Sequence, residues 1–452
     1  MGHVVRMTAT GAFGITFVFL VDAAGLLWLS QLGDAQMVAA VGFAYAIQFF
    51  SVSSGVGLMI AATAMISRSI GQGDRDRARR QAGAAVIVAV LVQAAVAALV
   101  VGFRHPLVAL AGAEGETARL AARYLAITVP SLVVMAAALV CSGALRAEGH
   151  GARAMYVTMY AGLLLMVLDP VLIYWLGWGL DGAAIGLVVF RLCLLALAIH
   201  YAVRKSDLVA LPGLPDLRAF LRPFLWLAAP TIATQLSTPA GNYLLTIVMA
   251  PFGDDAVAAW AVVGRLTVVV FGGLFALSGA IGGIFGQNFG AGQLDRVRRT
   301  YRDALVFCVI YALVAWALLL ASVPWVIGVF GLSGQGAEVL RAFARVGVGG
   351  YVFLGALFVA NAAFNNLGRP GRSTLVNWIK DGALSWPLAG ALAASFGAPG
   401  VIYGQAAAGV IVGTAAAVWA WAFLRGLSVP AELPLDPALP RPYPNPDRHR
   451  IR

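Results

Sequence analysis

Charged residues are scarce in this sequence. They make up 11% of its 452 positions, whereas hydrophobic residues make up 61% and the mean hydropathy is +0.86. An ordinary soluble domain is about a quarter charged, so this composition excludes that class. Cysteine is also rare: Cys141, Cys193 and Cys308 all fall in apolar runs without a CxxC pair. We therefore expect neither a disulfide framework nor a metal site.

Motifs of enzymes and of nucleic-acid-binding proteins are missing as well. There is no His-Glu-x-x-His, no Gly-x-Ser-x-Gly, and no Gly-Lys-Ser/Thr after the Gly-x-Gly segments. The net charge of +11 is spread over short loops rather than gathered on one face. These absences predict a protein that is not an enzyme, needs no cofactor and binds no nucleic acid.

Long apolar runs are what the sequence does contain. A helix needs about 20 apolar residues to cross the hydrocarbon core of a bilayer. Twelve runs meet this length, at residues 12–32, 37–69, 81–103, 119–146, 155–176, 182–203, 220–250, 256–290, 301–328, 338–366, 374–396 and 399–425. We predict an all-α polytopic membrane protein with twelve transmembrane helices.

The arginines between these runs predict the orientation. They cluster after the second, fourth, sixth, eighth and tenth runs, as in 75–80 and 296–302, while the alternate loops hold mainly acids. Basic loops stay on the cytoplasmic side. We therefore expect both termini in the cytoplasm of a cell whose plasma (inner) membrane the chain spans.

The sequence also repeats itself. IGQGDRDRARR at 70–80 and FGAGQLDRVRR at 289–299 share glycines, an aspartate and arginines at a constant offset of 219 residues. Each half holds six spans, so both halves insert with the same orientation, as in secondary transporters built from parallel repeats. We expect two pseudo-symmetric six-helix lobes at 1–205 and 220–425, a cytoplasmic linker at 206–219 and a disordered proline-rich tail at 426–452.

Two acids lie well inside apolar spans. Asp22 interrupts FVFLVDAAGLLW in the first span, and Asp169 precedes Pro170 in the fifth. A charged aspartate at a helix centre costs about 2.5–3.5 kcal/mol on insertion scales, so such residues usually handle ions or protons. Removal of a carboxyl group from water favours its protonated form, which makes a proton the natural ligand. The alternative is a structural acid that bonds to a neighbouring hydroxyl or backbone group.

The repeat serves as an internal comparison for these acids. At the offset of the repeat, Asp22 aligns with Asn242 and Asp169 with Leu388. We therefore expect proton chemistry in the first lobe alone. Pro170 frees a helix carbonyl and permits a local break, which favours a cavity-lining position; a packing kink is the alternative.

Four segments together resemble the multidrug and toxic compound extrusion (MATE) family over the chain up to about residue 425. They are SIGQGDRDRARR (69–80), its copy GQNFGAGQLDRVRR (286–299), LVDAAGL (20–26) in the first span, and LDPVLIYWLGWGLDGAAIG (168–186). The resemblance implies a V-shaped, cation-driven exporter of small amphiphilic or cationic organic compounds. Asp22 and Asp169 match the aspartates of its proton-coupled branch.

This chain departs from the family pattern around the two acids. Leu165 stands where the family commonly has Asn, Leu187 where it has Thr, and Val18 where a Tyr is found. The spans at 220–250 and 341–366 contain no acid. These departures favour simple carboxyl protonation over bound sodium. The expected function is multidrug or amphiphile efflux by antiport against protons, with alternating access between the lobes.

The second lobe offers polar and aromatic residues for a substrate cavity. These candidates are Gln235, Asn242, Tyr243, Trp260, Asn361, Trp378 and Trp386. Each of them singly is also typical of packing or of an interface anchor. The roles of Arg265, Lys380 and Asp381 stay open, since Lys380 and Asp381 can form a local pair near the cytoplasmic end of their span.

One other function within the wider superfamily fits the same fold. A flippase of a lipid-linked precursor is the alternative to drug export, but such proteins typically line their cavity with several arginines, and clear intramembrane cations are few here. A single chain with both lobes needs no partner to form the cleft. We therefore expect a monomer in contact with membrane lipid.

Overall fold

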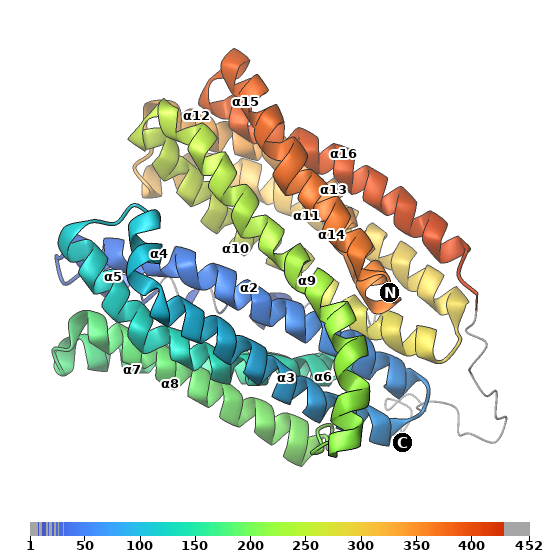
Figure 1. Ribbon diagram of the computed structural model, residues 1–452. Coiled ribbons are helices and arrows are strands. Elements are labelled where there is room, and N and C mark those ends of the chain that lie inside the picture. The colour runs from blue at the N-terminus through green and yellow to red at the C-terminus, as the bar shows by residue number, and fades with distance from the viewer. Residues whose placement is uncertain are drawn as a thin grey trace, which may run out of the picture.

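The structure is a computed structural model that describes residues 31–428, together with residues 8, 11–14, 17, 20, 21, 24, 25 and 27–29 of the first span. Asp22 and the proline-rich tail beyond residue 428 lie outside the described residues. The described part of the chain is a bundle of long helices arranged as two lobes (Figure 1).

The first lobe contains helices from both sides of each predicted span. They are α2 (Ala35–Gly71), α3 (Arg75–Gly102), α4 (Arg104–Leu110), α5 (Gly115–Thr128), the 3-10 turn η1 (Val129–Ser131), α6 (Leu132–Ala147), α7 (Gly151–Pro170), the π-helix η2 (Val171–Trp175), α8 (Gly179–Ile199) and the π-helix η3 (His200–Lys205).

The second lobe repeats this order. Its elements are α9 (Leu214–Met249), η4 (Ala250–Phe252), α10 (Asp254–Gly290), α11 (Leu294–Val329), α12 (Gly334–Ala342), the π-helix η5 (Phe343–Gly347), α13 (Val348–Asn366), α14 (Pro370–Trp378), the π-helix η6 (Ile379–Leu384), α15 (Ser385–Phe396) and α16 (Ala398–Arg425).

Nine stretches among the described residues are long and apolar enough to cross a membrane. The first span lies largely outside the description. The helix α9 and the composite helix α14–η6–α15 account for the other two spans. The predicted all-α, twelve-span, two-lobe fold is therefore confirmed.

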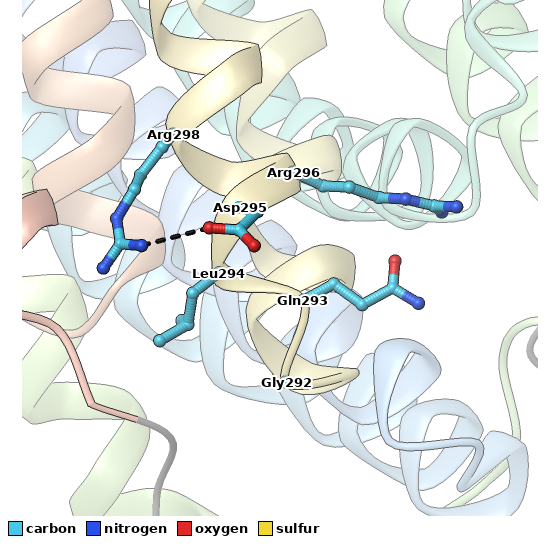
Figure 2. A pocket seen from close by; sticks show the side chains of 6 residues that line it. All are labelled: Gly292, Gln293, Leu294, Asp295, Arg296 and Arg298. Atoms are coloured by element: carbon cyan, nitrogen blue, oxygen red, sulfur yellow. Dashed lines mark hydrogen bonds and ion pairs between the residues drawn. The ribbon is translucent and has the colours of Figure 1, made fainter.

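Helix boundaries repeat between the lobes at the offset seen in the sequence. The helices α2 and α10 begin at Ala35 and Asp254 and end at Gly71 and Gly290. The turns that follow are also alike: Gly73 and Gly292 both have positive φ, which glycine adopts without strain. Figure 2 shows the second of these turns, with an ion pair between Asp295 and Arg298 at the start of α11. These loops with their arginines define what we call the basic end of the molecule.

Separate apolar cores lie in the two halves of the chain. One buried cluster runs from Leu245 to Leu424, and two others draw on residues from Val21 to Ala228. The helix α9 contributes to both, because Phe220 and Phe224 pack in the first half's core and Leu245 in the second half's. The second lobe's packing thus begins later than residue 220.

The two lobes meet at the basic end through a self-complementary contact between α2 and α10, which converge there in Figure 1. A Cβ at Gly71 would overlap the carbonyl oxygen of Gln287, and a Cβ at Gly290 would overlap that of Arg68. In the repeat, Gly71 corresponds to Gly290 and Arg68 to Gln287. The same patch therefore contacts itself across the pseudo-two-fold axis, and only glycine allows backbones this close.

Candidate proton and substrate sites

Asp169 ends the regular part of α7 and is buried at 5% exposure. Its carboxylate lies between two helices, where glycines make room for it. A Cβ at Gly25 of the first span would stand 3.1 Å from Oδ2, and a Cβ at Gly186 of α8 would clash with Oδ1. Bulkier residues at either position would displace the carboxylate.

The chain changes helical type directly after this acid. Pro170 has no N–H to continue the helical pattern, and the π-helix η2 follows it. Tyr174 in η2 donates a hydrogen bond to the carbonyl oxygen of Trp28, with the two rings edge-on at 6.5 Å. The segment after Asp169 is thereby attached to the first span.

The partner acid predicted for Asp169 lies outside the described residues. Gly25, which borders the Asp169 carboxylate, follows Asp22 by three residues, close to one helical turn. The described contacts thus bring Asp169 to the first span at the level of the next turn. The pairing of Asp22 with Asp169 stays a prediction.

A third acid, Asp381, is as deeply buried as Asp169, at 6% exposure. It lies in η6, between α14 and α15, where Ser237 of α9 donates a hydrogen bond of 3.0 Å to Oδ2. Lys380 forms an ion pair with Oδ1. The expectation that the second lobe lacks a buried acid is therefore wrong, because Asp381 is in the middle of a composite helix rather than near its end.

The alignment of Asp169 with Leu388 is also corrected by the structure. Gly186 faces Asp169 on α7, and its repeat counterpart Gly404 faces Ala389 on α15. The π-helix η6 inserts a residue into the second copy, so positions after it are displaced by one. Asp169 therefore corresponds to Ala389, and the second lobe places its acid at a different level.

The first lobe holds a buried cation at its centre. Arg191 of α8 is 4% exposed. Its guanidinium donates hydrogen bonds to three groups on neighbouring helices: the carbonyl oxygen of Thr128 at 2.6 Å, Oγ of Ser131 at 2.8 Å and Oε1 of Gln48 at 2.9 Å. Gln48 in turn donates to Oγ1 of Thr128. This network joins α2, α5, η1 and α8.

Three of the seven predicted substrate residues have hydrogen-bond partners within the second lobe. Asn361 is buried and accepts a hydrogen bond of 3.0 Å from Asn377. Trp260 donates to Thr246, and Trp378 donates to the carbonyl oxygen of Ala233. These contacts hold α10 and α14 against α9 and α13 and are compatible with a packing role.

The other four have different surroundings. Asn242, Tyr243 and Trp386 are exposed, and Gln235 is half-buried. No hydrogen bond described for the structure joins any two of the seven, so they do not form one bonded cluster in the described part of the chain. Arg265 is exposed on α10 as well.

Comparison with known proteins identifies the family. The MatE family model matches residues 12–171 and 230–389, one match in each half. The chain belongs to the MatE family. The MATE transporter VcmN from Vibrio cholerae, solved as a point mutant, shares 23% identity and superposes with a TM-score of 0.89, covering 95% of this chain and 98% of that one.

Curated members of the family are similar over most of their length. A FAD transporter of Shewanella oneidensis is 25% identical, with 85% of this chain and 86% of the relative covered. The multidrug export protein MepA of Staphylococcus aureus is 21% identical, with 84% of each covered. This chain is therefore a membrane transporter that handles small organic substrates, and it is not an enzyme.

Proposed function

We propose that this MatE transporter exports an amphiphilic organic substrate in exchange for protons that enter through the first lobe. The observation that carries the proposal is the position of Asp169, buried between Gly25 and Gly186. Buried intramembrane acids are rare and typically serve ion or proton pathways. Asp22, three residues before Gly25, supplies the second carboxyl group, and two acids this close titrate as a coupled pair.

The contact between the lobes supports an alternating-access cycle. The lobes touch at the basic end through Gly71 and Gly290, and the positive-inside rule assigns this end to the cytoplasm. We therefore assign the structure to a state that is closed toward the cytoplasm. Protonation of the acid pair from the outside releases the substrate, and the lobes then rock to receive another from the cytoplasm. A monomer suffices, since one chain carries both lobes.

The test is proton movement evoked by substrate in everted membrane vesicles. A membrane potential of 100 mV supplies about 2.3 kcal/mol per proton, or about 50-fold accumulation. We expect Asp22→Asn and Asp169→Asn each to abolish this coupling. Asp295→Asn, which removes an exposed acid, should retain it. Undiminished coupling in Asp22→Asn would show that the proton binds elsewhere.

A second candidate substrate is a flavin nucleotide. The FAD transporter matches this chain at 25% identity, against 21% for MepA at similar coverage. FAD carries two flat ring systems and an anionic diphosphate, whereas typical drug substrates are cationic. Efflux of FAD and of a fluorescent cationic dye should be measured in parallel, with and without an uncoupler. Uncoupler-sensitive efflux of FAD alone favours the flavin substrate, and of the dye alone favours drug export.

A further inference from the structure

The centre of the second lobe differs from that of the first at every position of the Arg191 network. In the repeat, Thr128 and Ser131 correspond to Gly347 and Gly350. Arg191 corresponds to Gly409, because the buried positions of α8 and α16 coincide at an offset of 218. These positions are Leu180, Gly182, Ala184, Gly186, Phe190, Arg191, Leu194 and Ala198 in α8, and Ala398, Gly400, Ile402, Gly404, Ala408, Gly409, Val412 and Ala416 in α16.

The three glycines line a cavity. Its volume is about 30 Å³, more than the roughly 10–15 Å³ that a water molecule needs. Side chains that carry hydrogen-bonding groups complete the wall: Lys380 of η6, Gln405 of α16 and Tyr351 of α13. Their counterparts in the first lobe, Ala161, Leu187 and Leu132, are apolar. Polar groups have thus moved to the opposite wall.

The cation at this cavity also differs in chemical character from Arg191. An arginine stays charged in proteins, whereas a lysine can lose its proton when buried. The Lys380 side chain is 13% exposed and is paired with Asp381, whose side chain is 8% exposed. Both members of the pair can therefore change charge, while the Arg191 network is fixed.

We propose that Lys380, Asp381 and the glycine-lined cavity form a second protonation site, in the second lobe, which a water molecule in the cavity supplies with protons. A proton delivered to Asp381 breaks its ion pair with Lys380. Ser237 keeps its hydrogen bond to the carboxyl group, and the lysine turns to the cavity. Because π-helices are frequent at functional sites, η6 is well placed to absorb the change.

The groups that surround the pair permit this exchange. On the elements packed against η6, α9 contributes the neutral Ser237 and α16 the neutral Gln405. The one other titratable group at the cavity is Tyr351, which shares a hydrogen bond of 3.2 Å with Thr267 and stacks on Phe271 at 4.1 Å. Among the described residues at this site, Lys380 and Asp381 therefore carry the charge.

Infrared difference spectroscopy of the purified protein in lipid tests the site directly. A pH step should produce a carboxyl band from protonated Asp381. The double variant Lys380→Gln/Asp381→Asn removes both charges, so no lone buried charge is left to unfold the protein. We expect this variant to lose the band. The matched variant Arg298→Gln/Asp295→Asn, which removes an exposed pair of the same lobe, should retain it.

An unchanged carboxyl spectrum in the double Lys380/Asp381 variant would overturn the proposal. The result is independent of proton coupling in the first lobe, because Asp169→Asn removes a different carboxyl group and should leave the Asp381 band in place. Loss of coupling in Asp169→Asn with the Asp381 band retained supports both sites. Retained coupling in Asp169→Asn with a lost Asp381 band in the double variant supports the second-lobe site alone.

The role of the cavity has its own variant. A Cβ at Gly409 would lie 3.6 Å from its nearest neighbour, the carbonyl oxygen of Gly350, so Gly409→Ala fits without a clash. The methyl group narrows the cavity, and we expect protonation of Asp381 after a pH jump to slow several-fold. Gly390→Ala, at an open position of α15, is the control. Wild-type speed in Gly409→Ala would exclude the cavity as the proton route.

Discussion

The two lobes have the same helices and different polar centres. Arg191 in the first lobe is held by three neutral acceptors, whereas three glycines in the second lobe leave a cavity beside the Lys380–Asp381 pair. The apolar packing has been kept through duplication while the buried charges moved to other helices. Helix geometry therefore tolerates large changes of polar content, provided that each buried charge keeps partners.

The same exchange occurs where α7 and α14 meet their neighbours. Gly162 of α7 accommodates Phe17 and Val21 of the first span. In the second lobe, Asp381 of η6 is accommodated by Ser237 and Gly241 of α9. Bulk and small residues have changed sides, so the separation of the helices is maintained. A lobe can thus gain an acid without a change of fold when the facing helix becomes smaller.

Loss of Arg191 should have the largest effect. Arg191→Leu leaves the carbonyl oxygen of Thr128 and the polar atoms of Ser131 and Gln48 without this donor. We expect the free energy of unfolding to fall by about 3–5 kcal/mol. Thermal unfolding in detergent measures the change, and Arg191→Lys should rescue little of it because lysine cannot bind three acceptors in a fixed fork.

The contrast between the lobes fails if the Lys380→Gln/Asp381→Asn variant is destabilised as much as Arg191→Leu. We expect it to unfold close to the wild-type temperature, since removing both members of a buried pair is often neutral. Equal destabilisation would mean that the Lys380–Asp381 pair is structural, as the Arg191 network is.

Glu148 provides the next largest effect and a pH dependence. Its side chain is 4% exposed and accepts hydrogen bonds from Arg75 at 2.7 Å and, in the charged state of the histidine, His150 at 3.0 Å. Burial opposes ionisation, but these bonds outweigh it and lower the pKa of Glu148 from its ordinary 4.5. The repeat counterparts of Arg75 and Glu148 are Leu294 and Leu367, which belong to the apolar packing of the second lobe.

Glu148→Gln should therefore destabilise the first lobe in a pH-dependent way. Because the pKa is lower in the folded than in the unfolded state, the stabilisation is complete above about pH 4.5 and is lost as the pH falls through the folded-state value. We expect a loss of about 1.5–3 kcal/mol near neutral pH and a smaller loss in acid. Unfolding at a series of pH values measures it, and a pH-independent loss would contradict the ionic origin.

The lobe interface allows a test in which the two copies should behave alike. Gly71→Ala and Gly290→Ala each place a methyl group against the backbone of the other lobe. We expect each to disfavour the state closed at the basic end by about 1–3 kcal/mol, the usual effect of overpacking. Spin labels on the exposed Arg77 and Arg296 report the separation of the lobes.

Gly102→Ala at an open position of α3 is the control for these two variants. An effect from one of the interface glycines and none from the other would show that the contact is not equivalent in the two lobes.

Much of the fold could be predicted from the sequence, and less of the site. The spans were correct to within several residues because hydropathy is a local property, and the constant offset between SIGQGDRDRARR and its copy predicted the repeat. The site of Asp381 was missed because position in an apolar run says little about which neighbours a side chain meets. The signal available was the set of glycines at 347, 350 and 409 opposite polar residues of the first half.

The sequence by itself determined that the chain crosses a membrane repeatedly, that its halves are copies and that acids interrupt its spans, since each of these is read from neighbouring residues or a constant spacing. Only the tertiary structure decided which groups share a site. A π-helix displaces one copy by a residue, so Asp169 corresponds to Ala389. Glycines far apart in sequence make a cavity only when three helices bring them together.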